Sequence, residues 1–167
     1  LRAAFVDMQV GVDEFADTDV IAQLEDDDRP DAVSMQEVFD SIPYPTFLID
    51  DEHTLLEYNV GINRLLNNED SHREWLGGDN RETIAAATYT DGSRHNSLAD
   101  KVVMNPHDAE DHWDIEDVSA DYGEYTDHTV YEDISVTKTE DGTETHIGFL
   151  AVPLFDEDGD VKAIFEL

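Results

Sequence analysis

The sequence predicts an α+β domain in which short helices cover one face of an antiparallel sheet. Strand-like runs stand at both ends of residues 34–167, and several short helical segments lie between them. Tight-turn signals such as Asp141-Gly142 separate the later runs, which favours antiparallel neighbours. Helices that connect such strands gather on one sheet face. Because the chain has 167 residues, we expect one main core.

Residues 1–33 are predicted to form a separate element, an amphipathic flanking helix followed by an acidic linker. Its apolar side chains recur at alternating spacings of four and three residues, which places them on one stripe of a helix, at Leu1, Phe5, Met8, Val12 and Phe15. The stripe fits a helix packed on its own domain and equally the end of a dimeric coiled coil. Residues 25–32 contain Pro30 and almost no apolar side chain, so they are interpreted as the linker.

The first half of the domain, residues 34–67, predicts a helix, a hairpin and a second helix. Helically spaced apolar residues between Ser34 and Ile42 are ended by Pro43. The β-rich runs Thr46–Asp50 and Thr54–Asn59 then form the hairpin. Val60–Asn67 has apolar residues at helical spacing.

The middle and the last part of the chain differ in regularity. Two short helices are predicted, around residues 82–89 and 97–104, and the acidic segment 106–127 is interpreted as a solvated loop or a lid. Three strands follow. Residues 128–137 alternate, with Val130, Ile134 and Val136 on one parity, and residues 146–155 are nearly all apolar, as in a central strand. An acidic turn leads into residues 161–167, so we expect five strands in all.

The charge of the chain limits its partners and its solvent. It carries 42 acidic against 9 basic residues, a formal net charge of -33, yet 40% of its residues are hydrophobic. We therefore expect a folded core with the acid on the surface, in a solvent of concentrated salt. This composition resembles the cytoplasmic proteins of salt-in haloarchaea. The same field repels nucleic acid phosphates and anionic membranes, so neither is an expected partner.

Several chemistries are excluded by residues that the sequence lacks. The chain has no cysteine, which rules out disulfides, thiolate catalysis and a flavin-cysteinyl adduct. No catalytic motif is present, so no catalytic residues are predicted. His107 and His112 are the best metal-ligand pair, but their spacing of five fits no helix face, and no metal site is expected. No apolar run approaches the ~20 residues of a membrane span. We expect a cytoplasmic piece of a longer parent protein, which could itself be membrane-anchored.

Two segments carry a resemblance to a known family. Residues 35–50, MQEVFDSIPYPTFLID, give an amphipathic helix, a proline break and a strand that ends in Asp, and Asn59 follows the next strand. Residues 149–166, FLAVPLFDEDGDVKAIFE, give a proline-containing strand, an acidic-Gly turn and a closing strand. These segments resemble the opening and the closing hairpin of Per-Arnt-Sim (PAS) sensor domains. The likeness covers residues 34–167 and is weak from 68 to 127.

The resemblance implies a PAS-like five-stranded antiparallel sheet whose concave face, with the helices, encloses a small pocket. It also implies signalling through flanking helices, often in a dimer, which here would form through the N-terminal helix. Heme-binding members use a histidine within the helix before the third strand, whereas His95 precedes that helix, so heme is not expected. Non-covalent flavin stays open. If the fold is PAS-like, the candidate ligand-binding residues are Phe47, Ile49, Tyr58, Asn59, Ile62, Leu66, Trp75, Leu98, Val102, Phe149, Ala151 and Phe165. Thr88 and Arg94 are further polar candidates.

Three functions follow in order of support. The leading hypothesis is a sensor that binds a small molecule and relays a conformational change to flanking helices, as in haloarchaeal chemotaxis transducers or sensor histidine kinases. The alternative is a ligand-free dimerisation and relay module with a packed interior. An enzyme is the weakest option, motivated only by the acidic segment 106–127.

Overall fold

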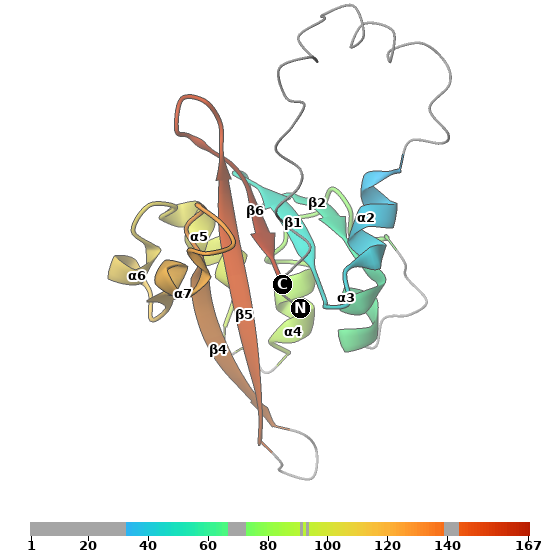
Figure 1. Ribbon diagram of the computed structural model, residues 1–167. Helices are drawn as coiled ribbons and strands as arrows, with labels where there is room; N and C mark the ends of the chain where they lie inside the picture. Colours follow the sequence, from blue (N-terminus) through green and yellow to red (C-terminus); the bar gives the residue numbers. More distant parts are fainter. Residues whose placement is uncertain (1–32, 67–72, 91, 93, 139–143) are drawn as a thin grey trace, which may run out of the picture. The chain divides into compact units, whose positions relative to one another are not determined.

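A computed structural model describes residues 33–66, 73–90, 92, 94–138 and 144–167. Within these ranges the chain forms one six-stranded antiparallel sheet in the order β2-β1-β6-β5-β4-β3 (Figure 1). The strands are β1 (Phe47–Asp50), β2 (Leu55–Tyr58), β3 (Glu116–Asp117), β4 (Tyr131–Lys138), β5 (Glu144–Phe155) and β6 (Val161–Glu166). The predicted α+β class is confirmed. The predicted flanking helix and linker, with the dimer contact assigned to that helix, lie outside the described residues.

The first and last described strands meet in the middle of the sheet. β6 pairs with β1 on one side and with β5 on the other, so Glu166 lies opposite both Phe47 and Ala151. Side chains directly opposite each other on neighbouring strands share one face of the sheet. Phe47, Ala151 and Glu166 therefore project together to the face that the helices cover.

The helices are short. They are α2 (Met35–Ser41), α3 (Val60–Leu65), α4 (Ile84–Thr88), α5 (Leu98–Met104), α6 (Ala109–His112) and α7 (Ser119–Tyr122). Ser97 caps α5 through a capping box with Asp100, and α5 packs across β4, β5 and β6. None of the helices in the described ranges has the length and apolarity needed to cross a bilayer.

The expectation of five strands is wrong by one. The sixth strand, β3, lies in the acidic segment 106–127, for which the sequence favours a loop or a lid, and it pairs Glu116 with Glu132 and Asp117 with Tyr131. Two helices, α6 and α7, flank it. The segment is held by buried Ala109 and Ile115 and by the Val118 amide, which donates to the Val130 carbonyl at 2.9 Å. A two-residue strand with exposed side chains leaves no alternation for a pattern to detect.

The inward face of β4 is polar. Tyr131, Asp133 and Ser135 are buried, whereas 54% of Ile134 is exposed. The apolar parity seen in the sequence therefore points away from the helices at Ile134. Asp133 can lie inside because Arg94 and Lys101 both bind its carboxylate, at 2.7 and 2.6 Å.

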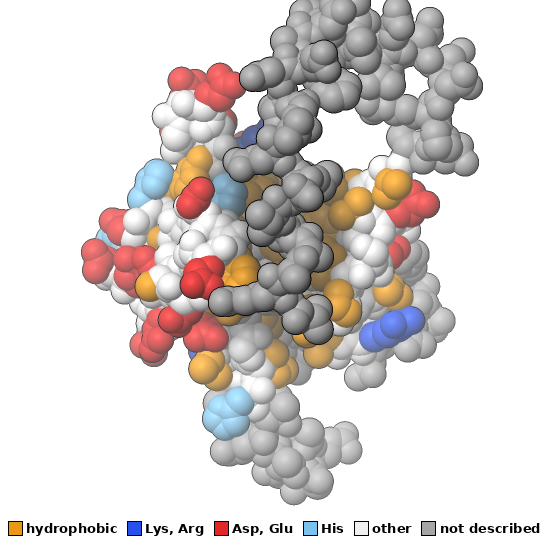
Figure 2. All heavy atoms as spheres, viewed as in Figure 1, with side chains coloured by type: hydrophobic (Ala, Val, Ile, Leu, Met, Phe, Trp, Pro, Cys, Tyr) orange, Lys and Arg blue, Asp and Glu red, His pale blue; other side chains and the backbone are white. Residues whose placement is uncertain are grey.

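The core beneath the helices is apolar, but acid enters it. Its fully buried side chains include Ile49, Leu55, Tyr58, Leu98 and Ile164. In Figure 2, acidic side chains gather on the side that carries α6 and α7 and at the turn between β5 and β6. Among the described residues, the expectation that the acid lies at the surface holds for most acidic side chains and fails for four buried ones, which are Glu57, Asp100, Asp133 and Glu166.

Candidate ligand cavity

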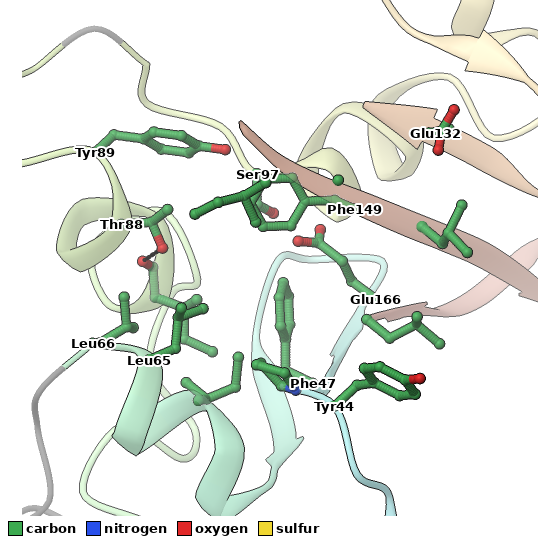
Figure 3. A pocket seen from close by; sticks show the side chains of 17 residues that line it. Tyr44, Phe47, Leu65, Leu66, Thr88, Tyr89, Ser97, Glu132, Phe149 and Glu166 are labelled. Atoms are coloured by element: carbon green, nitrogen blue, oxygen red, sulfur yellow. Dashed lines mark hydrogen bonds between the residues drawn. The ribbon is translucent and has the colours of Figure 1, made fainter. Parts of the chain in front are cut away.

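A cavity of about 490 Å³ lies between the helix-covered face of the sheet and helices α3 and α4. This volume falls within the range of about 300–1,000 Å³ that is usual for small-molecule sites. Figure 3 shows the side chains that surround it. The lining residues are Tyr44, Pro45, Phe47, Ile62, Leu65, Leu66, Ile84, Thr88, Tyr89, Ser97, Glu132, Ile147, Gly148, Phe149, Leu150, Glu166 and Leu167.

The walls of the cavity are mainly apolar. The rings of Phe47 on β1 and Phe149 on β5 project into it from the sheet (Figure 3). Ile62, Leu66 and Ile84 close the opposite side from α3 and α4. Such a surface favours the transfer of an apolar molecule from water, by roughly 25 cal/mol for each Å² that is buried.

Most polar groups in the lining are already bound to the protein. The Thr88 hydroxyl donates to the Ile84 carbonyl at 2.8 Å, within α4. The Tyr89 hydroxyl lies 3.4 Å from that of Ser135, and burial raises the pKa of the Tyr89 phenol. The Ser97 hydroxyl is bonded to Asp100 at 3.0 Å. These groups shape the wall more than they offer free hydrogen-bonding capacity.

Glu166 is the buried acid of the cavity. Only 3% of the residue is exposed, and its carboxylate points between the rings of Phe47 and Phe149 toward Ser97 (Figure 3). Its Oε2 accepts a hydrogen bond from the Ala99 amide at 2.6 Å. Burial raises the pKa of Glu166 to about 8. Hydrogen bonds from the Ala99 amide and the Ser97 side chain oppose this shift, and the charges of Asp100 and Asp133 add to it. The carboxyl therefore keeps its proton at neutral pH in the unliganded protein.

A polar cluster lies behind the cavity at the start of α5. Fully buried Asp100 accepts from the Ser97 amide at 2.8 Å and from the Asn80 side-chain amide at 2.8 Å. Its other oxygen lies 2.7 Å from Nδ1 of His53, a residue with a φ of 68° in the turn after β1. These bonds tie the β1–β2 turn to α5, so the cluster fixes the helix whose Ala99 amide binds Glu166.

Four of the twelve predicted pocket residues line the cavity, namely Phe47, Ile62, Leu66 and Phe149. Five are buried in the core instead, which are Ile49, Tyr58, Leu98, Val102 and Ala151. Trp75 lies against the Tyr58 ring at 5.9 Å between centroids, and Phe165 packs edge-on to Phe39 at 5.8 Å. Whether any of them binds a ligand stays a prediction.

Asn59 has a structural position. Its side-chain amide donates to the carbonyls of Phe39, Ile42 and Tyr44, at 3.2, 3.3 and 2.7 Å. Its oxygen accepts from the Thr46 amide at 3.1 Å and caps α3 through Ile62 at 3.3 Å. Asn59 thus holds the end of α2, the start of β1 and α3 together.

The two further polar candidates, Thr88 and Arg94, lie in different places. Thr88 lines the cavity, whereas Arg94 binds Asp133 on β4. Sequence reasoning did not select Glu166, although an acid within the apolar run 161–167 was a usable signal. It also did not select Tyr44, Leu65, Ile84, Tyr89 and Ser97, whose place depends on how the helices pack.

The two histidines considered for a metal have other neighbours. The His107 ring stacks on Phe155 with centroids 4.8 Å apart, and His112 lies 3.5 Å from Asp108. In the described ranges no group of three or more potential ligands could hold a metal ion.

Comparisons with known proteins find distant structural likeness. No family model and no curated protein matches the chain. The fold is similar to the PAS domain of BvgS from Bordetella pertussis, with 14% identity, a TM-score of 0.44 and coverage of 79% of this chain and 77% of that one. It is similar to a PAS domain from Colwellia psychrerythraea, with 12% identity, a TM-score of 0.42 and coverage of 78% and 87%.

A third similar structure is the PAS domain of an HTR-like protein from Haloarcula marismortui. The two chains share 15% identity over 89% of this chain and 96% of that one, with a TM-score of 0.37. At identities of 12–15% and TM-scores of 0.37–0.44, these likenesses assign neither a family nor a function to the chain.

Proposed function

We propose that the chain is a PAS-type sensor module that binds a small molecule in the cavity and relays a conformational change to neighbouring elements. The apolar cavity of about 490 Å³ between sheet and helices carries this proposal. The quoted PAS-like segments at both ends of residues 34–167 support it. A cytoplasmic module of a haloarchaeal signalling protein, dimeric through its N-terminal helix and without catalytic activity, is part of the same proposal.

The cavity touches both layers of the domain, which gives a route for relay. Phe149 belongs to β5 and Leu66 caps α3, so one ligand would contact sheet and helices at once. A ligand that binds one arrangement of these layers more tightly shifts the protein toward that arrangement. The rival relay module needs a packed interior, and a cavity of this volume favours the sensor.

The proposal is tested by a small-molecule screen with and without a blocked cavity. The full chain is kept in multimolar KCl, and binding is followed by ligand-observed NMR. Thr88→Phe places a ring into the cavity, and Thr90→Phe makes the same substitution at an exposed position. We expect ligands that bind the wild type and Thr90→Phe but not Thr88→Phe. If no small molecule binds the wild type, or if Thr88→Phe binds equally well, the sensor proposal fails.

A further inference from the structure

The charges around the cavity select the kind of ligand it can hold. The charged side chains among its lining residues are Glu132 and Glu166, both acidic, and no Lys or Arg belongs to that lining. Glu166 is buried and points into the cavity, whereas Glu132 is half-buried and lies on the far side of β5 in Figure 3. An anionic head group would find no basic side chain in this lining to pair with, so the lining disfavours carboxylate and phosphate ligands.

A hydrogen-bond donor is the group that complements Glu166. Its contacts with the Ala99 amide, which donates to Oε2 at 2.6 Å, and with the Ser97 side chain lie on the side of α5. A donor that enters the cavity can approach the carboxylate from the opposite side. A positively charged donor gains most, because charge-assisted hydrogen bonds are about twice as strong as neutral ones.

The aromatic rings add a second attraction for a cation. Phe47 and Phe149 flank the carboxylate (Figure 3), whereas the Tyr89 ring already has the Arg94 guanidinium 5.8 Å from its centroid. The face of an aromatic ring attracts an ammonium group, and the attraction is stronger when the group is partly desolvated. The same rings also accept an apolar body. The two halves of an amphipathic amine thus find their complements within one cavity.

We propose that the cavity binds organic amines that carry an apolar body, with the ammonium group paired to the carboxylate of Glu166. This inference depends on the proposed function and narrows it to one chemical class of ligand. Folding has already removed Glu166 from water, so the costs of forming the pair are the desolvation of the ligand's head group and the ionisation of the buried carboxyl.

Binding of a cation would be coupled to the release of a proton. The carboxyl of Glu166 is protonated at neutral pH. The titratable and charged groups around it are Asp100 of α5, Asp133 of β4 with its partners Arg94 and Lys101, and Tyr89 after α4. An ammonium next to Glu166 stabilises the ionised form and displaces the proton. With a pKa of about 8 in the free protein, the affinity for an amine should rise about tenfold from pH 7 to pH 9.

The test compares three probes with one body and different heads, which are phenylbutylamine, phenylbutanol and phenylbutanoate. Affinities for the full chain are measured by calorimetry in multimolar KCl. We expect the amine to bind the wild type at least tenfold more tightly than the alcohol, and the acid to bind weakest. Glu166→Gln, which keeps the side-chain shape, should abolish the preference for the amine while the alcohol binds as before. Glu116→Gln, at an exposed acid of β3, should leave all three affinities unchanged.

Defined outcomes overturn the inference. Three outcomes exclude Glu166 as the partner of an ammonium. The alcohol or the acid binds the wild type as tightly as the amine does; the preference for the amine survives Glu166→Gln; or the preference for the amine is lost only in Glu132→Gln. An amine affinity that does not change between pH 7 and pH 9 excludes the release of a proton from Glu166 on binding, and this measurement needs no variant. If none of the three probes binds while other molecules bind and are blocked by Thr88→Phe, the amine inference fails and the sensor proposal stands. If nothing binds at all, both fail.

Discussion

Two buried carboxylates lie at the start of α5, and their surroundings differ. Asp100 is surrounded by donors from Ser97, Asn80 and His53, at 2.7–3.0 Å. Glu166 has fewer donors, the Ala99 amide and the Ser97 side chain, and it faces a mainly apolar cavity. Where donors converge, a buried acid fixes the fold; where they do not, burial holds the acid in its protonated form. The first arrangement is structural, and the second leaves room for a ligand.

Removal of Asp100 should have the largest effect on stability. Asp100→Ala leaves the Ser97 amide, the Asn80 amide and the His53 ring without their buried acceptor. We expect the free energy of unfolding, measured by urea denaturation in high salt, to fall by about 3–5 kcal/mol. Asp108→Ala, at an exposed acid, should change it by less than about 0.5 kcal/mol. A loss below about 1 kcal/mol for Asp100→Ala would mean that the cluster is not structural.

Ionisation of Glu166 should lower the stability of the folded protein, because its buried carboxyl is favoured in the protonated form. The folded protein holds this proton up to pH of about 8, whereas an unfolded Glu loses it near its ordinary pKa of 4.5. The stability that the protonated carboxyl contributes is therefore complete below pH 4.5 and is lost as the pH rises to about 8. Glu166→Gln removes this dependence, so its stability relative to the wild type should increase by about 2–3 kcal/mol between pH 6 and pH 9.

The measurement is urea unfolding of both proteins at several pH values, in the same high salt. Taking the difference between them removes the contribution of the histidines, which both proteins share. Glu116→Gln should run parallel to the wild type. Parallel curves for Glu166→Gln as well would show that Glu166 ionises normally and that its surroundings are wetter than the structure indicates.

Asn59 extends the comparison to a buried polar side chain outside the cavity lining. Asn59→Asp keeps the acceptor for Thr46 and Ile62 but turns a carboxylate oxygen toward the carbonyls of Phe39 and Tyr44. We expect a loss of about 2 kcal/mol in the free energy of unfolding above pH 5, with partial recovery below pH 4, where the new acid can donate a proton. Asn96→Asp serves as the control, and an equal loss in both variants would contradict a special role for Asn59.

The smallest effect is expected within the cavity wall itself. The Thr88 hydroxyl binds only the Ile84 carbonyl of its own helix among the hydrogen bonds of the described residues. Thr88→Val should therefore change the free energy of unfolding by less than about 1 kcal/mol. The same denaturation series measures it. A loss as large as that of Asp100→Ala would show that this hydrogen bond in the cavity wall contributes as much stability as the polar cluster behind the cavity.

Much of the fold was predictable because its signals are local. Pro43, the acidic turn before β6 and the apolar run of β5 each mark an element boundary within a few residues. The orientation of β4 was not predictable, because Asp133 turns inward only when Arg94 and Lys101 arrive from a distant part of the chain. Four cavity residues were found from the PAS resemblance. The acid in the apolar run 161–167 marks Glu166 as unusual, but its place at the cavity depends on the strand register, which the sequence pattern does not give.

The meeting of β1 with β6 also bears on how the protein assembles during synthesis. β1 and β2 leave the ribosome early, but the place between β1 and β5 stays empty until β6 has been made. Until then two strand edges display unpaired backbone groups, which other chains can recruit. Folding must also wait for contacts between distant parts of the sequence, and such contacts form slowly. The growing chain is therefore most exposed to aggregation just before β6 emerges, and a chaperone would have most to protect at that stage.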